Sequence, residues 1–401
     1  MSASSTDRMS STERRAGISL AAVFALRMLG LFLILPVFAL YANDLPSGKD
    51  MALVGVALGA YGLTQACLQI AYGAASDHFG RKPVIVFGLL LFVIGSFVAA
   101  FADDIYVVIA GRVLQGAGAI SAAVTALAAD LTREQHLTKV MAMIGSSIGL
   151  VFAVSMVGAP LLYAAIGMPG IFSLTGGLAL LAIFVVVRVV PTAPMMPRQP
   201  AWQSFVEVLS HRQLLRLNFG VFALHLMLTA MWVLLPTELV RTGGLPVAEH
   251  WKVYLPALLI SFVIMVPAII AAERFARMKL IFNTAIVLLL CVQAGFGLFA
   301  GGLYGLAFWL MLFFVSFNIL EATQPSLISR IAPPHAKGAA LGVYNTTQAL
   351  GLFLGGVLGG VLAQYAGPGA VWAGGALLTL VWLMLGLTMV MPAVRKRPAA
   401  V

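Results

Sequence analysis

Charged side chains are scarce in this chain. Asp, Glu, Lys and Arg make up only 9% of its 401 residues, whereas hydrophobic residues make up 61%. A water-soluble domain of this length needs far more polar surface to cover its core. The composition therefore excludes a soluble globular fold.

The chain has only two cysteines, and it lacks the sequence motifs of common enzymes. The two cysteines, Cys67 and Cys291, lie far apart inside apolar stretches, so we expect neither a disulfide framework nor a metal site. The sequence has no Walker motif, no nucleophile–base pair and no cluster of metal ligands. We therefore expect no enzyme activity, no cofactor and no energy from ATP hydrolysis.

Long apolar runs are abundant instead. Runs of about 20 residues recur along the whole chain, each long enough to cross a bilayer as a helix. They are continuous rather than alternating in period two, which argues against membrane strands. The twelve spans begin near Ala16, Met51, Pro83, Ile105, His136, Met168, Gln213, Glu249, Leu280, Gly302, Ala336 and Gly369. The predicted fold class is an all-α polytopic membrane protein.

Basic residues set the orientation of these spans. With the N-terminus in the cytoplasm, only Lys49, Arg241 and Lys252 of the 24 Lys and Arg fall outside. Two lie within spans, and all the others fall in cytoplasmic loops and tails, which is a positive-inside pattern with both termini in the cytoplasm. Topology thus explains the net charge of +10, and we expect no nucleic-acid partner. We see no cleavable signal peptide and expect the first span to act as an uncleaved insertion signal.

A proline-rich interruption divides the chain. Residues 191–212 contain four prolines and predict a cytoplasmic linker, with a short interfacial helix around 202–209. The predicted organisation is a tail (1–15), a six-helix bundle (16–190), the linker (191–212), a second six-helix bundle (213–391) and a tail (392–401).

The two predicted bundles resemble each other. SDHFGRK follows the second span, and AERFARMK follows the eighth. At one constant offset Asp77 aligns with Glu273, Phe79 with Phe275, and Arg81 with Arg277. We infer an internal duplication with a degraded second copy, since Ala276 replaces Gly80.

Three motifs point to a known family. The loop after the second span reads G-x-x-S-D-x-x-G-R-K, formed by Gly73, Ser76, Asp77, Gly80, Arg81 and Lys82. The fourth span contains GRVLQGAGAI, with Arg112, Gln115, Gly116 and Gly118, and the fifth contains GLVFAVSMVGAP, with Gly149, Gly158 and Pro160. In these motifs and in its six-plus-six topology the chain resembles the major facilitator superfamily, with two pseudo-symmetric six-helix bundles. Within that superfamily it resembles the bacterial drug/proton antiporters, although Ala159 interrupts the fifth-span motif.

A narrower likeness, to the YajR type of these transporters, is carried by RMLGLFLILPV and LTREQHLTKVMAMIG. It implies a place in the bacterial inner membrane. YajR-type proteins can carry a soluble C-terminal domain, which we do not expect here because the chain ends just after Arg397.

The resemblance also implies a conformational latch after the second span. In the family the loop acid engages the start of the eleventh span and locks the outward-open state, so Asp77 is expected to contact residues 335–338. Arg81 is expected to pair with Asp130, and Glu273 with Arg277 would form the second-half copy. Lys82 belongs to the latch or serves only as a topology determinant.

Three charged residues lie well inside predicted spans: Arg27, Arg112 and Glu321. Each costs about 2.5–3.5 kcal/mol to insert, so a functional or pairing role is the default interpretation. Glu321 is the candidate for reversible protonation, and the alternative is a permanent structural pair with Arg27 or Arg112.

The resemblance links Arg112 to proton transfer, with snorkelling or helix pairing as the alternative. Arg27 stands where many relatives carry an acid. It either takes part in gating of the transporter or forms a structural pair with another side chain. His225 either titrates near neutrality or is a satisfied hydrogen-bonding histidine.

Substrate-cavity candidates share a helix face with polar residues. They are Met28, Phe32, Gln65, Gln69, Gln115, Trp232, Phe317, Asn318, Asn345 and Gln348. The abundance of Met and Phe, 18 and 24 residues, is typical of promiscuous binding.

The leading hypothesis is a monomeric secondary transporter that exports amphipathic, apolar or cationic compounds in exchange for protons by alternating access. Its expected partners are a small-molecule substrate, protons and the lipid bilayer. One alternative is an exporter of a sugar or small metabolite. Another is a non-transporting membrane sensor, against which the short tails argue.

Overall fold

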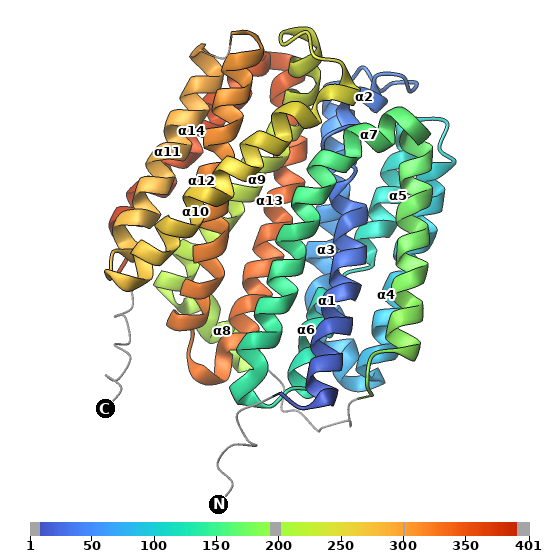
Figure 1. The fold of residues 1–401 in the computed structure, drawn as a ribbon, viewed down its shortest axis with the longest axis vertical. Coiled ribbons are helices and arrows are strands. Elements are labelled where there is room, and N and C mark those ends of the chain that lie inside the picture. Colours follow the sequence, from blue (N-terminus) through green and yellow to red (C-terminus); the bar gives the residue numbers. More distant parts are fainter. Residues whose placement is uncertain (1–8, 193–201, 300, 391–401) are drawn as a thin grey trace, which may run out of the picture. The chain divides into compact units, whose positions relative to one another are not determined.

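The computed structural model describes residues 9–192, 202–299 and 301–390, and within these ranges the chain is helical and contains no strand. The predicted tail 392–401 lies outside the described residues, as do residues 1–8. The first half contains α1 (Ser11–Phe32), α2 (Phe38–Ala42), α3 (Met51–Phe79), α4 (Arg81–Ala100), α5 (Ile105–Ala117), α6 (Ser121–Asp130) and α7 (Glu134–Arg188) (Figure 1).

The second half contains more helices and two 3₁₀ turns. They are α8 (Trp202–Ser210), α9 (Arg212–Arg241), η1 (Val247–Glu249), α10 (Trp251–Arg274), α11 (Met278–Phe299), α12 (Gly302–Ile331), η2 (Pro334–Ala336), α13 (Lys337–Ala366) and α14 (Pro368–Leu387). The short helix α8 occupies the place of the predicted interfacial helix. Its Val208 is buried, while Val206 and Leu209 are exposed.

Eleven stretches of the described residues are long and apolar enough to cross a membrane. The longest, Gln135–Arg188, holds two crossings, because Gly167 has non-helical angles (φ 66°, ψ −178°) that separate two helices within α7. Glycine adopts this positive φ without steric cost. Helices α5 and α6 together form a single crossing, Ile105–Asp130. The described residues thus provide twelve crossings, and the predicted all-helical fold class is confirmed.

The chain divides into two compact units. Unit 1 comprises Met1–Lys49 and Val56–Gln199, and unit 2 comprises Asp50–Gly55 and Pro200–Val401. The main division falls inside the segment 191–212 that the sequence marks as a linker. The first residues of α3 are grouped with unit 2.

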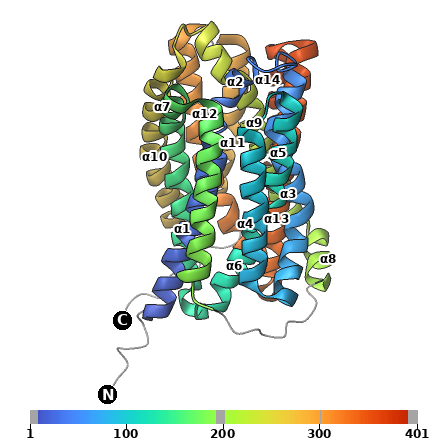
Figure 2. The same ribbon diagram turned by 90° about the vertical axis from the view of Figure 1, so that its right-hand side faces the viewer.

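Helices pair in the same way within each unit. In unit 1, α1 packs along α7, and α4 packs against α5 and α7, as Figure 1 and Figure 2 show for α4 and α5. In unit 2, α9 packs along α13, and α11 packs against α14. The first span therefore pairs with the fifth as the seventh does with the eleventh, as internal duplication predicts.

Apolar side chains fill each unit and also cover its outside. In unit 1 a buried cluster joins Leu20 and Phe24 of α1, Leu89 of α4 and Val124 of α6. Large apolar side chains such as Phe87 remain exposed, as lipid-facing helices require.

Candidate functional site

Arg81 is the centre of the loop after the second span. Gly80 separates α3 from α4 with a φ of 92°, which places Arg81 in the first turn of α4. The Arg81 guanidinium lies 2.5 Å from Oδ1 of Asp77 (Nη2) and 2.9 Å from Oδ2 of Asp130 (Nε), and it donates to Ser76 Oγ at 2.6 Å. The side chains of Arg81 and Asp130 are only 9% and 13% exposed. One cation therefore ties together the ends of α3, α4 and α6.

The other latch candidates lie nearby. A Cβ at Gly73 would make only an ordinary contact with Ala122 of α6, at 3.6 Å. Lys82 is half-buried beside Arg81. The expected contact of Asp77 with residues 335–338 would join the two units and stays a prediction. Within unit 2, His335 Nε2 lies 2.8 Å from Oε2 of Glu207 in α8.

The second copy of the loop uses its charges differently. Glu273 at the end of α10 pairs with Arg330 near the end of α12, with 2.7 Å between Oε1 and Nη2. Arg277, the counterpart of Arg81, has no ion-pair partner among the described residues. It follows Ala276, whose φ of 55° repeats the left-handed turn made by glycine in the first copy. Each copy of the motif thus forms an ion pair with a residue at the end of a later span. In the first copy the motif supplies the cation, Arg81, and its partner is Asp130; in the second copy the motif supplies the acid, Glu273, and its partner is Arg330.

Two arginines are buried within unit 1, and both lie near the same tyrosine. The side chains of Arg27 and Arg112 are 0% and 1% exposed, and their guanidinium carbons lie 5.7 Å and 5.1 Å from the ring centroid of Tyr61. Arg27 donates to the hydroxyls of Ser121 and Tyr61, and Arg112 donates to Oε1 of Gln115 at 2.8 Å. In the described part of unit 1 neither guanidinium pairs with a carboxylate. The expected pairing of either with Glu321 would join the two units and stays a prediction.

Glu321 lies in a polar cluster of unit 2. Its Oε2 is 3.7 Å from Nε2 of His225, and its Oε1 accepts from Nε2 of Gln348 at 3.5 Å. The same amide nitrogen is 2.6 Å from His225 Nε2, while His225 Nδ1 lies 3.1 Å from the Val221 carbonyl. This arrangement fits a neutral imidazole that carries its proton on Nδ1 and accepts at Nε2. The ring of Phe317 packs edge-on against His225, with centroids 5.8 Å apart.

The Glu321 cluster is only partly buried. The Glu321 side chain is 36% exposed, yet its Oε2 is buried and accepts no hydrogen bond from the described residues. A proton added to His225 Nε2 would give that oxygen a cationic partner. The cluster therefore brings a carboxylate and an imidazole together at one partly exposed place.

The remaining cavity candidates differ in their surroundings. Gln65 donates to Gln69 at 3.4 Å between Nε2 and Oε1, both side chains are buried, and each retains an unpaired polar atom among the described residues. Asn318 donates to Ser261 Oγ at 2.8 Å. Trp232 is fully buried among aromatic rings of α10 and α12, which is a packing environment. The half-buried candidates are Met28, Phe32 and Asn345.

The glycines of the fifth-span motif lie on an open face of α7. A Cβ at Gly149 or at Gly158 would meet no atom within 4 Å. Close packing in this conformation therefore does not require glycine at either position. Pro160 is accommodated inside the helix.

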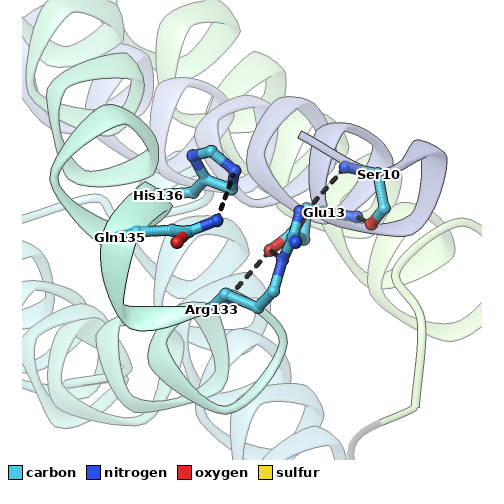
Figure 3. A network of polar contacts seen from close by, with 5 residues as sticks. All are labelled: Ser10, Glu13, Arg133, Gln135 and His136. Carbon is cyan, nitrogen blue, oxygen red and sulfur yellow. Dashed lines mark hydrogen bonds and ion pairs between the residues drawn. The ribbon is translucent and has the colours of Figure 1, made fainter. Parts of the chain in front are cut away.

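A polar network at the start of α1 was missed by the sequence analysis (Figure 3). Glu13 is buried and closes a capping box with Ser10, with 2.7 Å from the Ser10 amide to Oε2. Its carboxylate also accepts from Nε, Nη2 and the backbone amide of Arg133, each at 2.9 Å, and these hydrogen bonds raise the pKa of Arg133. Next to this pair, His136 is buried, and Gln135 Nε2 lies 3.4 Å from its Nε2. The S-x-x-E spacing of Ser10 and Glu13 predicts the cap, but no local sequence pattern predicts that Arg133, 120 residues away, is the partner of Glu13.

Twelve helical crossings in two similarly paired bundles, with charged side chains inside spans of both, define a membrane transporter of the secondary type. The chain belongs to the Major Facilitator Superfamily, which it matches over residues 20–355. It is 45% identical over 390 residues to the "Inner membrane transport protein YajR" of Escherichia coli (strain K12), covering 96% of this chain and 85% of that protein. It is 26% identical to the "Multidrug resistance protein MdtH" of Aeromonas salmonicida (strain A449), covering 90% of this chain and 89% of that protein.

A solved structure has the same fold. The human organic anion transporter MFSD10 superposes with a TM-score of 0.71 at 18% identity, covering 94% of this chain and all of that one. By its family and its YajR relative, the chain is a multi-pass membrane transporter and not an enzyme.

Proposed function

We propose that this transporter exports amphipathic, apolar or cationic compounds in exchange for protons. The observation that carries the proposal is the contact of Glu321 with His225, two groups that bind protons and lie 3.7 Å apart in a partly open cluster. A carboxylate in this position attracts either a proton or a cationic substrate, and competition between them is the simplest basis for antiport. The name of the distant MdtH relatives, multidrug resistance protein, supports a drug-like substrate.

The latch residues give this exchange a conformational step. Arg81 with Asp77 and Asp130 forms an ionic cluster at the ends of three helices, in which Arg81 and Asp130 are nearly buried and Asp77 is 44% exposed. We infer that it stabilises one access state of the transporter by about 1–3 kcal/mol, enough to bias a two-state equilibrium. Alternating access then opens the Glu321 cluster first to one membrane face and then to the other. In this proposal both termini lie in the cytoplasm of a bacterial inner membrane, and the monomer is the working unit.

A second candidate is export of a small metabolite that carries an anionic group. It is favoured by Arg27 and Arg112, two buried cations that pair with no carboxylate in the described part of unit 1. An anion reaching this pair would gain two charge-assisted contacts.

A proton-flux measurement in proteoliposomes tests the proposal. Lipophilic cations, neutral amphiphiles and anionic metabolites are added in turn, and the pH change inside the vesicles is recorded for the wild type and for Glu321→Gln. We expect cations and amphiphiles to elicit strong proton movement in the wild type and only a small residual movement in the variant. Proton movement elicited only by anionic metabolites would favour the second candidate, and flux unchanged in Glu321→Gln would remove Glu321 as the proton carrier.

A further inference from the structure

A groove opens on the lipid-facing side of unit 2, between the first turns of α11 and the last turns of α14. The two helices lie side by side in Figure 1, and the groove between them encloses about 700 Å³. Its walls are apolar, formed by Leu280 and Val287 of α11 and by Leu383 and Leu387 of α14. Leu280 and Leu387 are 60% and 57% exposed, so the groove is open to the surrounding bilayer.

One end of this groove is cationic. Arg277 and Lys279 line it together with the polar side chains of Asn283 and Thr284, and no acid is among its lining residues. Neither cation has an ion-pair partner among the described residues. Oδ1 of Asn283 is buried and accepts no hydrogen bond from the described part of the chain.

The exchange of charges in the second loop explains why these cations are available. In unit 1 the loop arginine, Arg81, is paired with Asp77 and Asp130. In unit 2 Arg330 takes the acid, Glu273, and Arg277 is left to face the groove. A role in topology alone requires a positive charge but no adjoining groove.

We propose that this groove, which we name the α11–α14 groove, binds one anionic membrane phospholipid. Arg277 and Lys279 hold the phosphate, and the acyl chains lie along the leucines and Val287. Basic residues beside an apolar groove between membrane helices match the two halves of such a lipid. The site is independent of the proton cluster, and it extends the protein's contacts with the bilayer beyond nonspecific solvation.

Lipid retention measured by native mass spectrometry tests this proposal. The protein is reconstituted into nanodiscs of equimolar phosphatidylglycerol and phosphatidylcholine. It is then released from the nanodiscs in the mass spectrometer, and the lipid that stays bound to it is identified by its mass. The test variant is Arg277→Gln/Lys279→Gln. The matched control is Arg188→Gln/Lys139→Gln, which removes one exposed Arg and one exposed Lys from unit 1.

We expect the wild type and the control to retain phosphatidylglycerol in preference to phosphatidylcholine. The groove variant should lose this preference by roughly 25-fold, or about fivefold for each cation removed. Leu383→Trp, which keeps both cations and fills the groove, should lose retention as well. Equal preference in the groove variant and the control would overturn the proposal.

Competition with soluble glycerol phosphate separates a lipid site from a phosphate site. The acyl chains contribute most of the expected affinity, so the soluble ester should leave the retained lipid in place. Displacement by the ester would show that the phosphate alone is recognised and would also overturn the proposal. Transport is not measured in these experiments, so their failure and that of the proposed exchange of substrate for protons are distinguishable.

Discussion

Nε2 of His225 and Oε2 of Glu321 face each other at 3.7 Å, and Gln348 bridges them from the side. The imidazole is fixed by its contact with the Val221 carbonyl, so Nε2 is the nitrogen available to the acid. We infer that the two groups act as one proton-binding unit, in which changing either partner changes the other.

The first prediction concerns this unit. We expect His225→Asn to lower substrate-driven proton flux by about tenfold, because Asn cannot take the shared proton. We also expect His225→Asn/Glu321→Gln to be no slower than Glu321→Gln alone, as residues that act together are not additive. His250→Asn is the control, since His250 is buried in the same unit but bonds to the Leu245 carbonyl. If His225→Asn slowed proton flux by the same factor in the Glu321→Gln background as in the wild type, the two residues would act independently and would not share a proton.

The second prediction concerns the latch. Asp77→Asn should abolish transport while expression and membrane insertion stay intact, because the amide keeps the shape of the side chain but loses its charge for Arg81. Transport in proteoliposomes and protein recovered from membranes are the two measurements. Asp103→Asn, a change at another exposed acid of unit 1, should transport normally. A fully active Asp77→Asn would rule out the latch.

The third prediction separates the two cations near Glu273. A double-mutant cycle between Glu273→Gln and Arg330→Gln should give a coupling of about 0.5–1 kcal/mol, a value typical of exposed pairs. Their side chains are 53% and 37% exposed. The matching cycle between Glu273→Gln and Arg277→Gln should give none, since no contact joins them. Thermal unfolding in one detergent supplies all the free energies, and a larger coupling to Arg277 would contradict the observed pairing.

These contacts mark the limits of prediction from sequence. Apolar runs predicted the spans because bilayer thickness fixes helix length, and even the boundary within α7 at Gly167 lies next to the predicted start of the sixth span at Met168. The partner of Glu273 was not predictable, because the repeat supplies a nearby arginine, whereas the packing of α10 on α12 brings another one, Arg330. Trp232 looked like a cavity residue because periodicity identifies a helix face but not the helix that covers it.

The fourth prediction concerns the missed network. Glu13→Gln should lower the free energy of unfolding by about 1–2 kcal/mol, because the carboxylate accepts from Arg133 three times and closes the cap with Ser10. Ser10→Ala, which removes only the cap, should cost about 1 kcal/mol. Denaturant titration in detergent measures both. Arg14→Gln at the next, exposed position is the control, and equal stability of all three variants would show that Arg133 contributes nothing.

The fifth prediction uses two glycines of the family motifs. A Cβ at Gly116 would lie 2.1 Å from the backbone oxygen of Tyr61, so Gly116→Ala must push α5 away from α3. Overpacking of this kind costs about 1–3 kcal/mol, and here it also displaces the ring that lies beside both Arg27 and Arg112. Gly149→Ala meets no atom within 4 Å and should leave thermal stability unchanged or slightly raised, since alanine favours the helix. The two melting temperatures, measured side by side, check the close approach of α5 to α3. If Gly116→Ala melted at the wild-type temperature, the backbones of these helices could not be in contact at Tyr61.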